Sequence, residues 1–419
     1  MKKFLSFIIF ILITSIISCE GNYESNNNYI EGKDAQYMYI SMNSQQYITA
    51  SNEGYYFING LYLYYCDFNT MESVVLCNKP NCLHDKELDE TKKFNCNAFL
   101  LTGNNTTLLT IYNNYIYCYI DYDFLKDDTP VPELIRISLD GSERKTICEL
   151  EEDITSIALH RGVLYYSTSK IPTDKIEEEQ GINYYELKEY DIFKAFSKPN
   201  VIHSGKGMMA IINDITPIGN KVRYTVYSVE NNMFVGREKD YDIKENNITS
   251  IAEDIKVTDM GPLTTDGENY IFTPIYISDE GVEYDDYIYT TNIVSGKSEK
   301  LFKRESKDIM NYSDDKYIYI DNILSFDYEN EDYSDFTRTI TVYDKKGNKI
   351  DCIDVTGVDE YSYFIGGDER YMFVKGEDIE GAYIKYIDKS KIGTGNAKLE
   401  TLFEIERKYL DTTVRRKLD

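Results

Sequence analysis

The sequence predicts an all-β protein that forms a single β-propeller, with seven four-stranded blades and with six or eight blades as alternatives. Three observations lead to this prediction. The chain has 40 Tyr and 18 Phe but only 8 Pro and no Trp, a composition that favours strands. Apolar residues rarely recur at the 3.6-residue spacing of a helix. One aromatic motif recurs at a period typical of propeller blades, which two β-sandwich domains would not produce.

The repeated motif is a turn followed by three strand-forming residues, the last of which is aromatic. Successive copies are 47 to 60 residues apart, and each copy is expected to form strand b of a blade. The short apolar segments before them, such as YITASN and LLTIYN, are expected to form the inner strand a. The seven copies end at Phe57, Tyr117, Tyr165, Tyr224, Phe272, Tyr319 and Phe373.

Strands c and d are predicted from hairpins later in several units. LIRISLDGSERKTI, YIYTTNIVSGKSEKLF and TITVYDKKGNKIDCI alternate apolar and polar residues on both sides of a tight turn. The turns LDGS and YDKKGN resemble those of TolB-like propellers over residues 43 to 406. The fourth unit is weak, and YMYIS at 37 to 41 is a candidate outer strand that would fasten the ring to the last blade.

The N-terminus predicts export and a lipid anchor. Lys2 and Lys3 precede an uncharged run that is too short to span a membrane. The following Ile16 to Cys19 resembles the lipobox of bacterial lipoproteins, which implies cleavage before Cys19 and diacylglycerol on its thiol. The expected organisation is a signal peptide at 1–18, a lipidated flexible tether at 19–36, the propeller at 37–410 and a tail at 411–419.

The charge of the chain excludes one class of partner. A formal net charge of −27 argues against nucleic-acid binding, which needs cationic surface. Long acidic loops are predicted at the end of the propeller where strands b lead to c and strands d to the next a. We expect this end to bind a protein, peptide or glycan, since function often lies on loops of a rigid scaffold. The alternative is that these loops are only solvated. The candidate residues are Asp121, Asp123, Asp127, Glu177, Glu178, Asp285, Asp286, Asp327, Glu329 and Asp332.

The segment LCNKPNCLHD, followed by FNCNAF, carries a possible metal shell. Cys77, Cys82, His84 and Cys96 supply three thiolates and one imidazole, which is a complete tetrahedral set for structural zinc. A disulfide is the competing interpretation for an exported protein, and free thiols are the third. The segment also resembles a loop in uncharacterised propeller lipoproteins of Gram-positive anaerobes, whose reducing surroundings would favour metal. The segment is expected on the acidic-loop end.

Motifs for catalysis are missing from the sequence. It contains no G-x-S-x-G elbow, P-loop or H-E-x-x-H motif. DYDFLKD at 121 to 127 is similar to the opening of a calcium loop but lacks its glycine and final glutamate. The predicted function is therefore a membrane-anchored, extracytoplasmic, non-catalytic binding propeller. The alternatives are a glycan-active hydrolase or lyase that uses carboxylates, and a scaffold subunit of an envelope complex.

Overall fold

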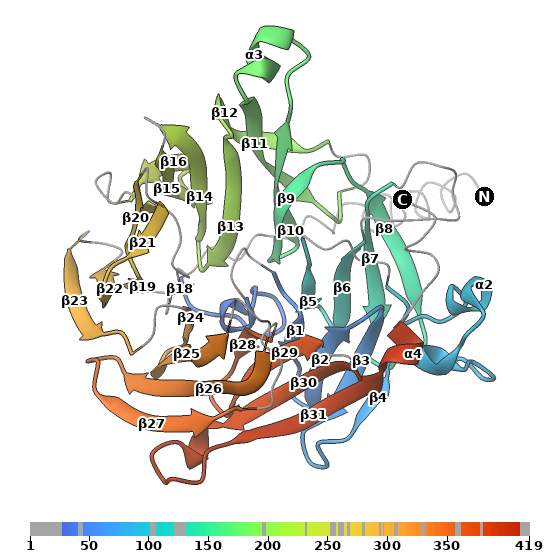
Figure 1. Ribbon diagram of the computed structural model, residues 1–419. Coiled ribbons are helices and arrows are strands. Elements are labelled where there is room, and N and C mark those ends of the chain that lie inside the picture. Colours follow the sequence, from blue (N-terminus) through green and yellow to red (C-terminus); the bar gives the residue numbers. More distant parts are fainter. Residues whose placement is uncertain are drawn as a thin grey trace, which may run out of the picture.

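The predicted propeller is confirmed by a computed structural model, in which the described residues form seven antiparallel four-stranded sheets arranged as a ring (Figure 1). In each sheet the first strand is the innermost. The described residues are 27–40, 45–100, 106–120, 131–194, 198–230, 233–251, 257–258, 264–265, 269–278, 281–292, 295, 297–305, 309–327, 332–356, 362–377 and 380–410. Cys19 and the rest of residues 1–26, like the tail at 411–419, lie outside them.

The first four blades follow the chain in order. Blade 1 contains β1 (Ile48–Ala50), β2 (Gly54–Asn59), β3 (Tyr62–Asp67) and β4 (Ser73–Val75). Blade 2 contains β5 (Leu109–Tyr112), β6 (Tyr115–Ile120), β7 (Glu133–Ser138) and β8 (Arg144–Glu149). Blade 3 contains β9 (Ile154–His160), β10 (Val163–Lys170), β11 (Ile182–Asp191) and β12 (Asn200–Met208). Blade 4 contains β13 (Ile211–Ile218), β14 (Lys221–Glu230), β15 (Met233–Asp242) and β16 (Asn247–Ser250), and β17 (Val257–Thr258) also pairs with β15.

The last three blades complete the ring. Blade 5 contains β18 (Thr264–Thr265), β19 (Asn269–Phe272), β22 (Tyr287–Asn292) and β23 (Ser298–Lys303). The chain between its second and third strands forms a separate hairpin of β20 (Ile275–Ser278) and β21 (Gly281–Tyr284). Blade 6 contains β24 (Ile309–Ser313), β25 (Tyr317–Asp327), β26 (Asp332–Asp344) and β27 (Lys349–Asp354). Blade 7 contains β28 (Tyr363–Gly367), β29 (Tyr371–Glu377), β30 (Gly381–Asp388) and β31 (Leu399–Glu406). The short helices are η1 (Tyr37–Tyr39), η3 (His84–Lys86), α2 (Glu90–Lys93), α3 (Lys175–Glu179), η4 (Lys389–Lys391) and α4 (Arg407–Leu410).

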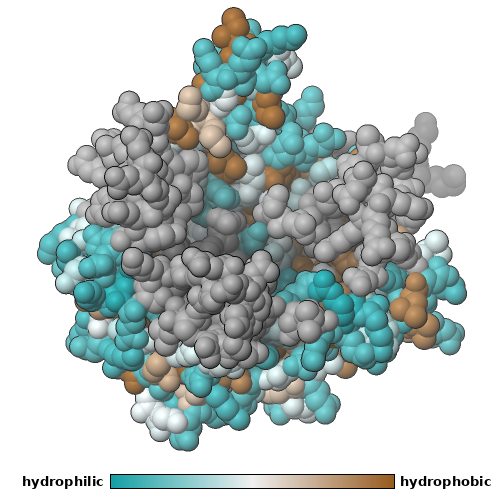
Figure 2. All heavy atoms as spheres, in the orientation of Figure 1, coloured by the Kyte–Doolittle hydropathy of each residue, from teal (hydrophilic) through white to brown (hydrophobic). Residues whose placement is uncertain are grey.

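The repeated aromatic residues are part of the core, as the motif predicts. All seven lie on strand b of their blade, and six of them are at most 1% exposed, whereas Phe272 is only partly buried. Large rings at this position fill the space between neighbouring sheets. Most of the coloured surface in Figure 2 is hydrophilic, and hydrophobic atoms lie at the outer end of the part of blade 3 that contains α3. No helix among the described residues has the length and apolar character needed to cross a bilayer.

Residues 27–40, called here the crossing segment, run over the end of the ring where strands a turn into strands b. Gly32 accepts a hydrogen bond from the Asn113 backbone of blade 2 at 2.9 Å. In blade 3, His160 Nδ1 accepts one from the Ala35 backbone at 3.2 Å. The crossing segment also reaches blade 1, where Gln36 Oε1 accepts a hydrogen bond from the Ala50 backbone at 2.9 Å.

A buried ion pair holds the crossing segment. Arg161 Nε lies 2.6 Å from Asp34 Oδ1, and both side chains are 2% exposed. The backbone of Asn27 lies against Gly219 in blade 4, so close that a Cβ on that glycine would be 3.0 Å from it. The structure therefore differs from the predicted flexible tether over residues 27–36, because these residues pack on the propeller.

The ring closes without an exchanged strand. All four strands of blade 7 come from the end of the chain, and residues 37–39 form the 3-10 helix η1 rather than the candidate outer strand. Blades 7 and 1 are joined by side chains instead. Tyr55 Oη donates to Asp368 Oδ2 at 2.6 Å, and the Tyr55 and Phe373 rings meet edge to face with centroids 4.9 Å apart. Aromatic packing between blades thus replaces backbone pairing at the closure.

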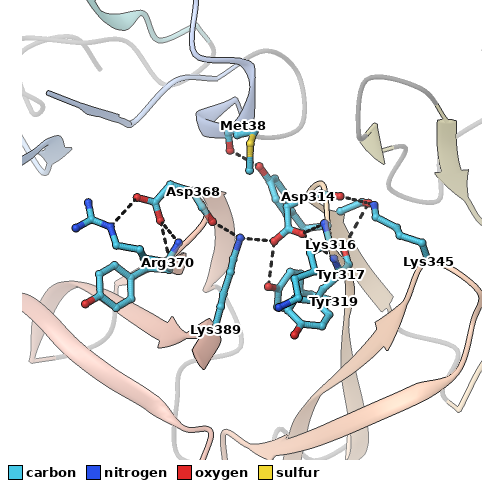
Figure 3. Close-up of polar contacts among 12 residues, drawn as sticks. Met38, Asp314, Lys316, Tyr317, Tyr319, Lys345, Asp368, Arg370 and Lys389 are labelled. Carbon is cyan, nitrogen blue, oxygen red and sulfur yellow. Dashed lines mark hydrogen bonds and ion pairs between the residues drawn. The ribbon is translucent and has the colours of Figure 1, made fainter. Parts of the chain in front are cut away.

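A polar cluster joins blades 6 and 7 below the crossing segment (Figure 3). Lys389 Nζ lies 2.5 Å from Asp314 Oδ2, and both side chains are at most 3% exposed. Asp314 also accepts a hydrogen bond from Tyr319 Oη at 3.0 Å. The Tyr312 hydroxyl donates to the Met38 carbonyl of the crossing segment. These contacts satisfy groups that would be costly to bury alone.

Candidate metal centre

The four predicted ligands meet at one place. The nitrogen or sulfur ligand atoms of Cys77, Cys82, His84 and Cys96 all lie within 4.8 Å of one another, the one such group of potential metal ligands among the described residues. Cys96 Sγ and His84 Nδ1 are 3.7 Å apart. In a tetrahedral zinc site with bonds of about 2.3 Å to sulfur and about 2.0 Å to nitrogen, these atoms would be about 3.5 Å apart. The cluster can therefore hold a metal ion such as zinc.

The local backbone places the ligands. Cys77 comes two residues after the end of β4, and the chain then turns through Asn81 and His84, which have positive φ values of 62° and 55°. Such backbone is uncommon outside glycine and often marks a functional constraint. Helix α2 returns the chain to Cys96, and Asp89 caps it by accepting a hydrogen bond from the Thr91 backbone at 3.1 Å. Lys79 Nζ donates to the Asn95 carbonyl at 2.7 Å and ties the two halves of the loop together.

The thiols are unequal in their protonation. Burial works against a Cys77 thiolate, but hydrogen bonds from the backbone N–H groups of Lys79 and Asn97 outweigh it and lower the Cys77 pKa. Burial raises the Cys96 pKa far above its ordinary value, and the nearby Cys77 and Cys82 raise it further. Three adjacent thiolates repel one another, so a divalent cation would stabilise them together.

The loop that carries the cluster fastens blade 1 to blade 2. Asn97 Nδ2 donates to the Gly141 carbonyl of the β7–β8 turn at 2.9 Å. A Cβ on Gly141 would lie 2.7 Å from the Leu76 backbone, and its φ is +70°, so only glycine suits this contact. On the other side, Leu63 donates a backbone hydrogen bond to the Ala98 carbonyl at 2.9 Å. A metal in the cluster would lock this inter-blade contact.

The position of the loop differs from the predicted one. It does connect strand d of blade 1 to strand a of blade 2, but it lies on the outer rim, and Figure 1 shows α2 at the outer edge of the ring. The strands of a twisted blade turn away from the ring axis toward the rim. The end of strand β4 therefore meets the β7–β8 turn of the next blade instead of standing among the long acidic loops. The sequence carries no signal for Gly141 and Asn97 as partners of this loop.

The other cysteines do not compete for the site. The seven described cysteines are all free thiols, so the structure contains no disulfide among the described residues. Cys66 and Cys118 are buried in strands and belong to the apolar core.

The predicted acidic binding residues have several environments. Asp121, Asp123, Asp127 and Glu329 lie outside the described residues, as does the whole DYDFLKD candidate for calcium. Glu177 and Glu178 lie on α3, where Lys206 Nζ contacts Glu177 Oε1 at 2.7 Å. Asp285 accepts a hydrogen bond from the Tyr287 backbone at 2.9 Å, and Asp286 lies 3.9 Å from Lys303 Nζ. Asp327 and Asp332 are backbone partners in the β25–β26 hairpin. The described residues do not bring these carboxylates into one site.

Comparisons with known proteins agree with the architecture. No protein-family model matches the chain, and no curated protein matches it in sequence. A structure from a study of two prolyl endopeptidases is 12% identical with a TM-score of 0.51 and covers 87% of this chain, which spans 50% of that one. TolB from Acinetobacter baumannii is 14% identical with a TM-score of 0.39, over 84% of this chain and 78% of that one. An oligogalacturonate lyase from Vibrio parahaemolyticus is 13% identical with a TM-score of 0.44, over 67% of this chain and 75% of that one. These similarities concern the propeller fold alone.

Proposed function

We propose that this protein is a lipid-anchored, extracytoplasmic β-propeller that binds a partner without catalysis, through the acidic-loop end of the ring. The projection of blade 3, defined as residues 171–181 with Met208 and Met209, carries this proposal. It stands out from the ring around α3 (Figure 1). Its described side chains combine exposed apolar groups with carboxylates. Binding residues often lie on loops that a rigid scaffold holds in place.

Four apolar side chains of the projection are exposed to solvent. Ile171 is 71% exposed, Ile176 is 66%, Met209 is 57% and Met208 is 41%. Backbone contacts bring their segments together, since Met209 donates to the Gly181 carbonyl at 2.7 Å and Met208 pairs with Ile182. Grouped exposed apolar side chains, in contrast to single ones, mark interaction sites in soluble proteins.

The projection is also preorganised and acidic. Asp174 caps α3 by accepting hydrogen bonds from the Ile176 and Glu177 backbones, at 2.9 and 3.2 Å. Residues 171–181 contain four carboxylates and one lysine. A partner with apolar side chains beside basic ones would complement both properties. The proposed partner is therefore a basic amphipathic segment of a protein or peptide.

The test uses a defined probe, a fluorescent amphipathic peptide of lysine and leucine, and measures binding by anisotropy. The double variant Ile176→Ser and Met209→Ser is expected to bind it at least tenfold more weakly, because burial of either side chain is worth about 1.5–3 kcal/mol. Val74→Ser is the control, since Val74 is 58% exposed on blade 1. Equal binding by the double variant and the control would refute the proposed surface.

The cysteine and histidine cluster contributes structure to this proposal rather than chemistry. Its four protein ligands would fill the shell of a zinc ion and leave no position for water or substrate. We propose that it binds one structural zinc ion that holds blades 1 and 2 together. The absence of disulfides among the described cysteines supports metal over the disulfide alternative.

The environment of the buried carboxylates supports binding over glycan cleavage. Each described buried carboxylate has a cation or a hydroxyl as its partner. The pairs are Asp34 with Arg161, Asp240 with Arg223, Asp314 with Lys389, Asp321 with Arg338, Glu133 with Thr146, and Glu238 with Tyr270. These buried carboxylates already have partners within the protein, whereas a glycosidase needs two carboxylates that face a substrate.

Glu238 makes stability depend on pH. Burial raises its pKa to about 8, although hydrogen bonding to Tyr270 and the charge of Arg223 lower it. An unfolded glutamate titrates near 4.3, so the folded state holds the proton more tightly between about pH 4 and 8. The penalty for ionising Glu238 therefore grows as pH rises through this window. Glu238→Gln is expected to raise the free energy of unfolding by about 3–5 kcal/mol at pH 9 and to change it little at pH 4.

Urea unfolding at both pH values measures this effect, with the exposed Glu245→Gln as the control in the same blade. The same change in stability at pH 4 and pH 9 would contradict the assignment of the penalty to Glu238 ionisation.

A further inference from the structure

The two ends of the propeller differ strongly in charge. Apart from the rim loop between β4 and β5, the connections from strands b to c and from strands d to a contain 27 acidic and 5 basic residues, whereas the turns from a to b and from c to d contain 11 acidic and 12 basic residues. Most of the net charge of −27 thus belongs to one end. The opposite end is close to neutral.

Lysines surround the neutral end. The c to d turns of blades 3 to 7 each present at least one exposed lysine. These residues are Lys194, Lys198, Lys244, Lys297, Lys346 and Lys398. Blades 1 and 2 lack a lysine in this turn. An anionic membrane surface attracts each nearby lysine by about 1 kcal/mol and repels the acidic end.

The crossing segment leaves the ring at the same neutral end. Asn27 lies against Gly219, in the a to b turn of blade 4, and the Asp34–Arg161 pair fixes the chain close behind it. Only seven residues separate Asn27 from Cys19. Eight chain steps at about 3.3–3.6 Å each reach about 26–29 Å at most.

This length is too short to bring the acidic end to the membrane. From the inner turn of a blade, the chain would first cross three strand spacings of about 4.8 Å, which is about 14 Å. It would then follow the length of a blade, and six residues of strand at about 3.3 Å each add about 20 Å. The path of about 34 Å exceeds the reach of the tether even before the long acidic loops are included.

We propose that the neutral, lysine-ringed end faces the anionic membrane surface and that the acidic end with the blade 3 projection faces away from it. This inference rests on the proposed lipid anchor at Cys19. It orients the proposed binding surface toward partners outside the membrane. The length of the tether limits the distance between the neutral end and the membrane. The difference in charge between the two ends favours this orientation over the opposite one.

The test uses the full-length lipidated protein in vesicles of 30% phosphatidylglycerol and 70% phosphatidylethanolamine, compared with the same protein in detergent. Hydrogen exchange is measured by mass spectrometry. Peptides covering 243–246, 345–348 and 389–398 are expected to exchange at least twofold more slowly on vesicles. The peptide covering 171–181 is expected to exchange at the same rate in both.

A matched pair of charge variants separates orientation from anchoring. Lys244→Glu, Lys346→Glu and Lys398→Glu together should abolish the protection, whereas Lys170→Glu, Lys175→Glu and Lys408→Glu make the same charge change at the acidic end and should preserve it. Protection of 171–181 instead, or of neither end, would overturn the proposed orientation. A Cys19→Ala protein that still sediments with membranes would refute the lipid anchor itself, a separate outcome.

Discussion

Replacing Cys77 with serine is expected to remove one zinc ion per chain and to loosen the contact between blades 1 and 2. The reason is that backbone hydrogen bonds favour the Cys77 thiolate by lowering its pKa, and that Cys77 begins the loop two residues after the end of β4. Structural zinc sites in small domains are worth about 10–16 kcal/mol of apparent binding free energy. Here the loop also has backbone contacts to both blades, so we expect local opening of residues 77–96 with several degrees of lost thermal stability.

Elemental analysis and thiol counting on residues 20–419, purified without oxidant, measure this prediction. The wild-type protein should contain one zinc ion, and His84→Ala should lose it as Cys77→Ser does. Cys352→Ser is the control, because Cys352 is an exposed free thiol away from the cluster. If the wild-type protein contains no metal and two or more thiols are missing from the count, the loop is held by a disulfide and the zinc site is refuted.

Replacing Asp34 with alanine is expected to lower the free energy of unfolding by about 3–5 kcal/mol, because it leaves the buried guanidinium of Arg161 without its carboxylate. The same change should free the crossing segment from the ring. Arg161 donates to Asp34 through both Nε and Nη2, at 2.6 and 2.9 Å, so a substituted alanine removes a bidentate partner. Urea unfolding measures the loss, and limited proteolysis near residue 34 measures the release.

Two variants check the cause of this effect. Glu31→Ala removes an exposed carboxylate from the same segment and should change stability by less than about 0.5 kcal/mol. The double variant Asp34→Ala with Arg161→Met should recover part of the loss, since it removes the unpaired charge as well. A double variant that is as unstable as the two single changes combined would point to packing instead of charge.

The sequence by itself was sufficient to predict the architecture and the grouping of the four candidate metal ligands. Strand b residues such as Tyr165 and Phe373 recur because every blade must cover the same inter-blade surface. The aromatic motif therefore repeats along the sequence once per blade. The sequence also predicted the grouping of four residues, because they lie within one short loop and local chain geometry brings them together. These are Cys77, Cys82, His84 and Cys96.

Only the tertiary structure decided the contacts between distant parts of the chain. The loop at Cys77 lies on the rim because it meets Gly141 of the next blade, and the twist of the blades, which sets that meeting, has no local signature. Likewise, the sequence of residues 27–36 predicted a polar tether, yet Asp34 is buried in an ion pair with Arg161, 127 residues away in the chain. A period or a short motif is encoded locally, whereas the partner of a single buried charge depends on the closed ring. For the same reason the end of the propeller over which the crossing segment runs could be determined only from the folded structure.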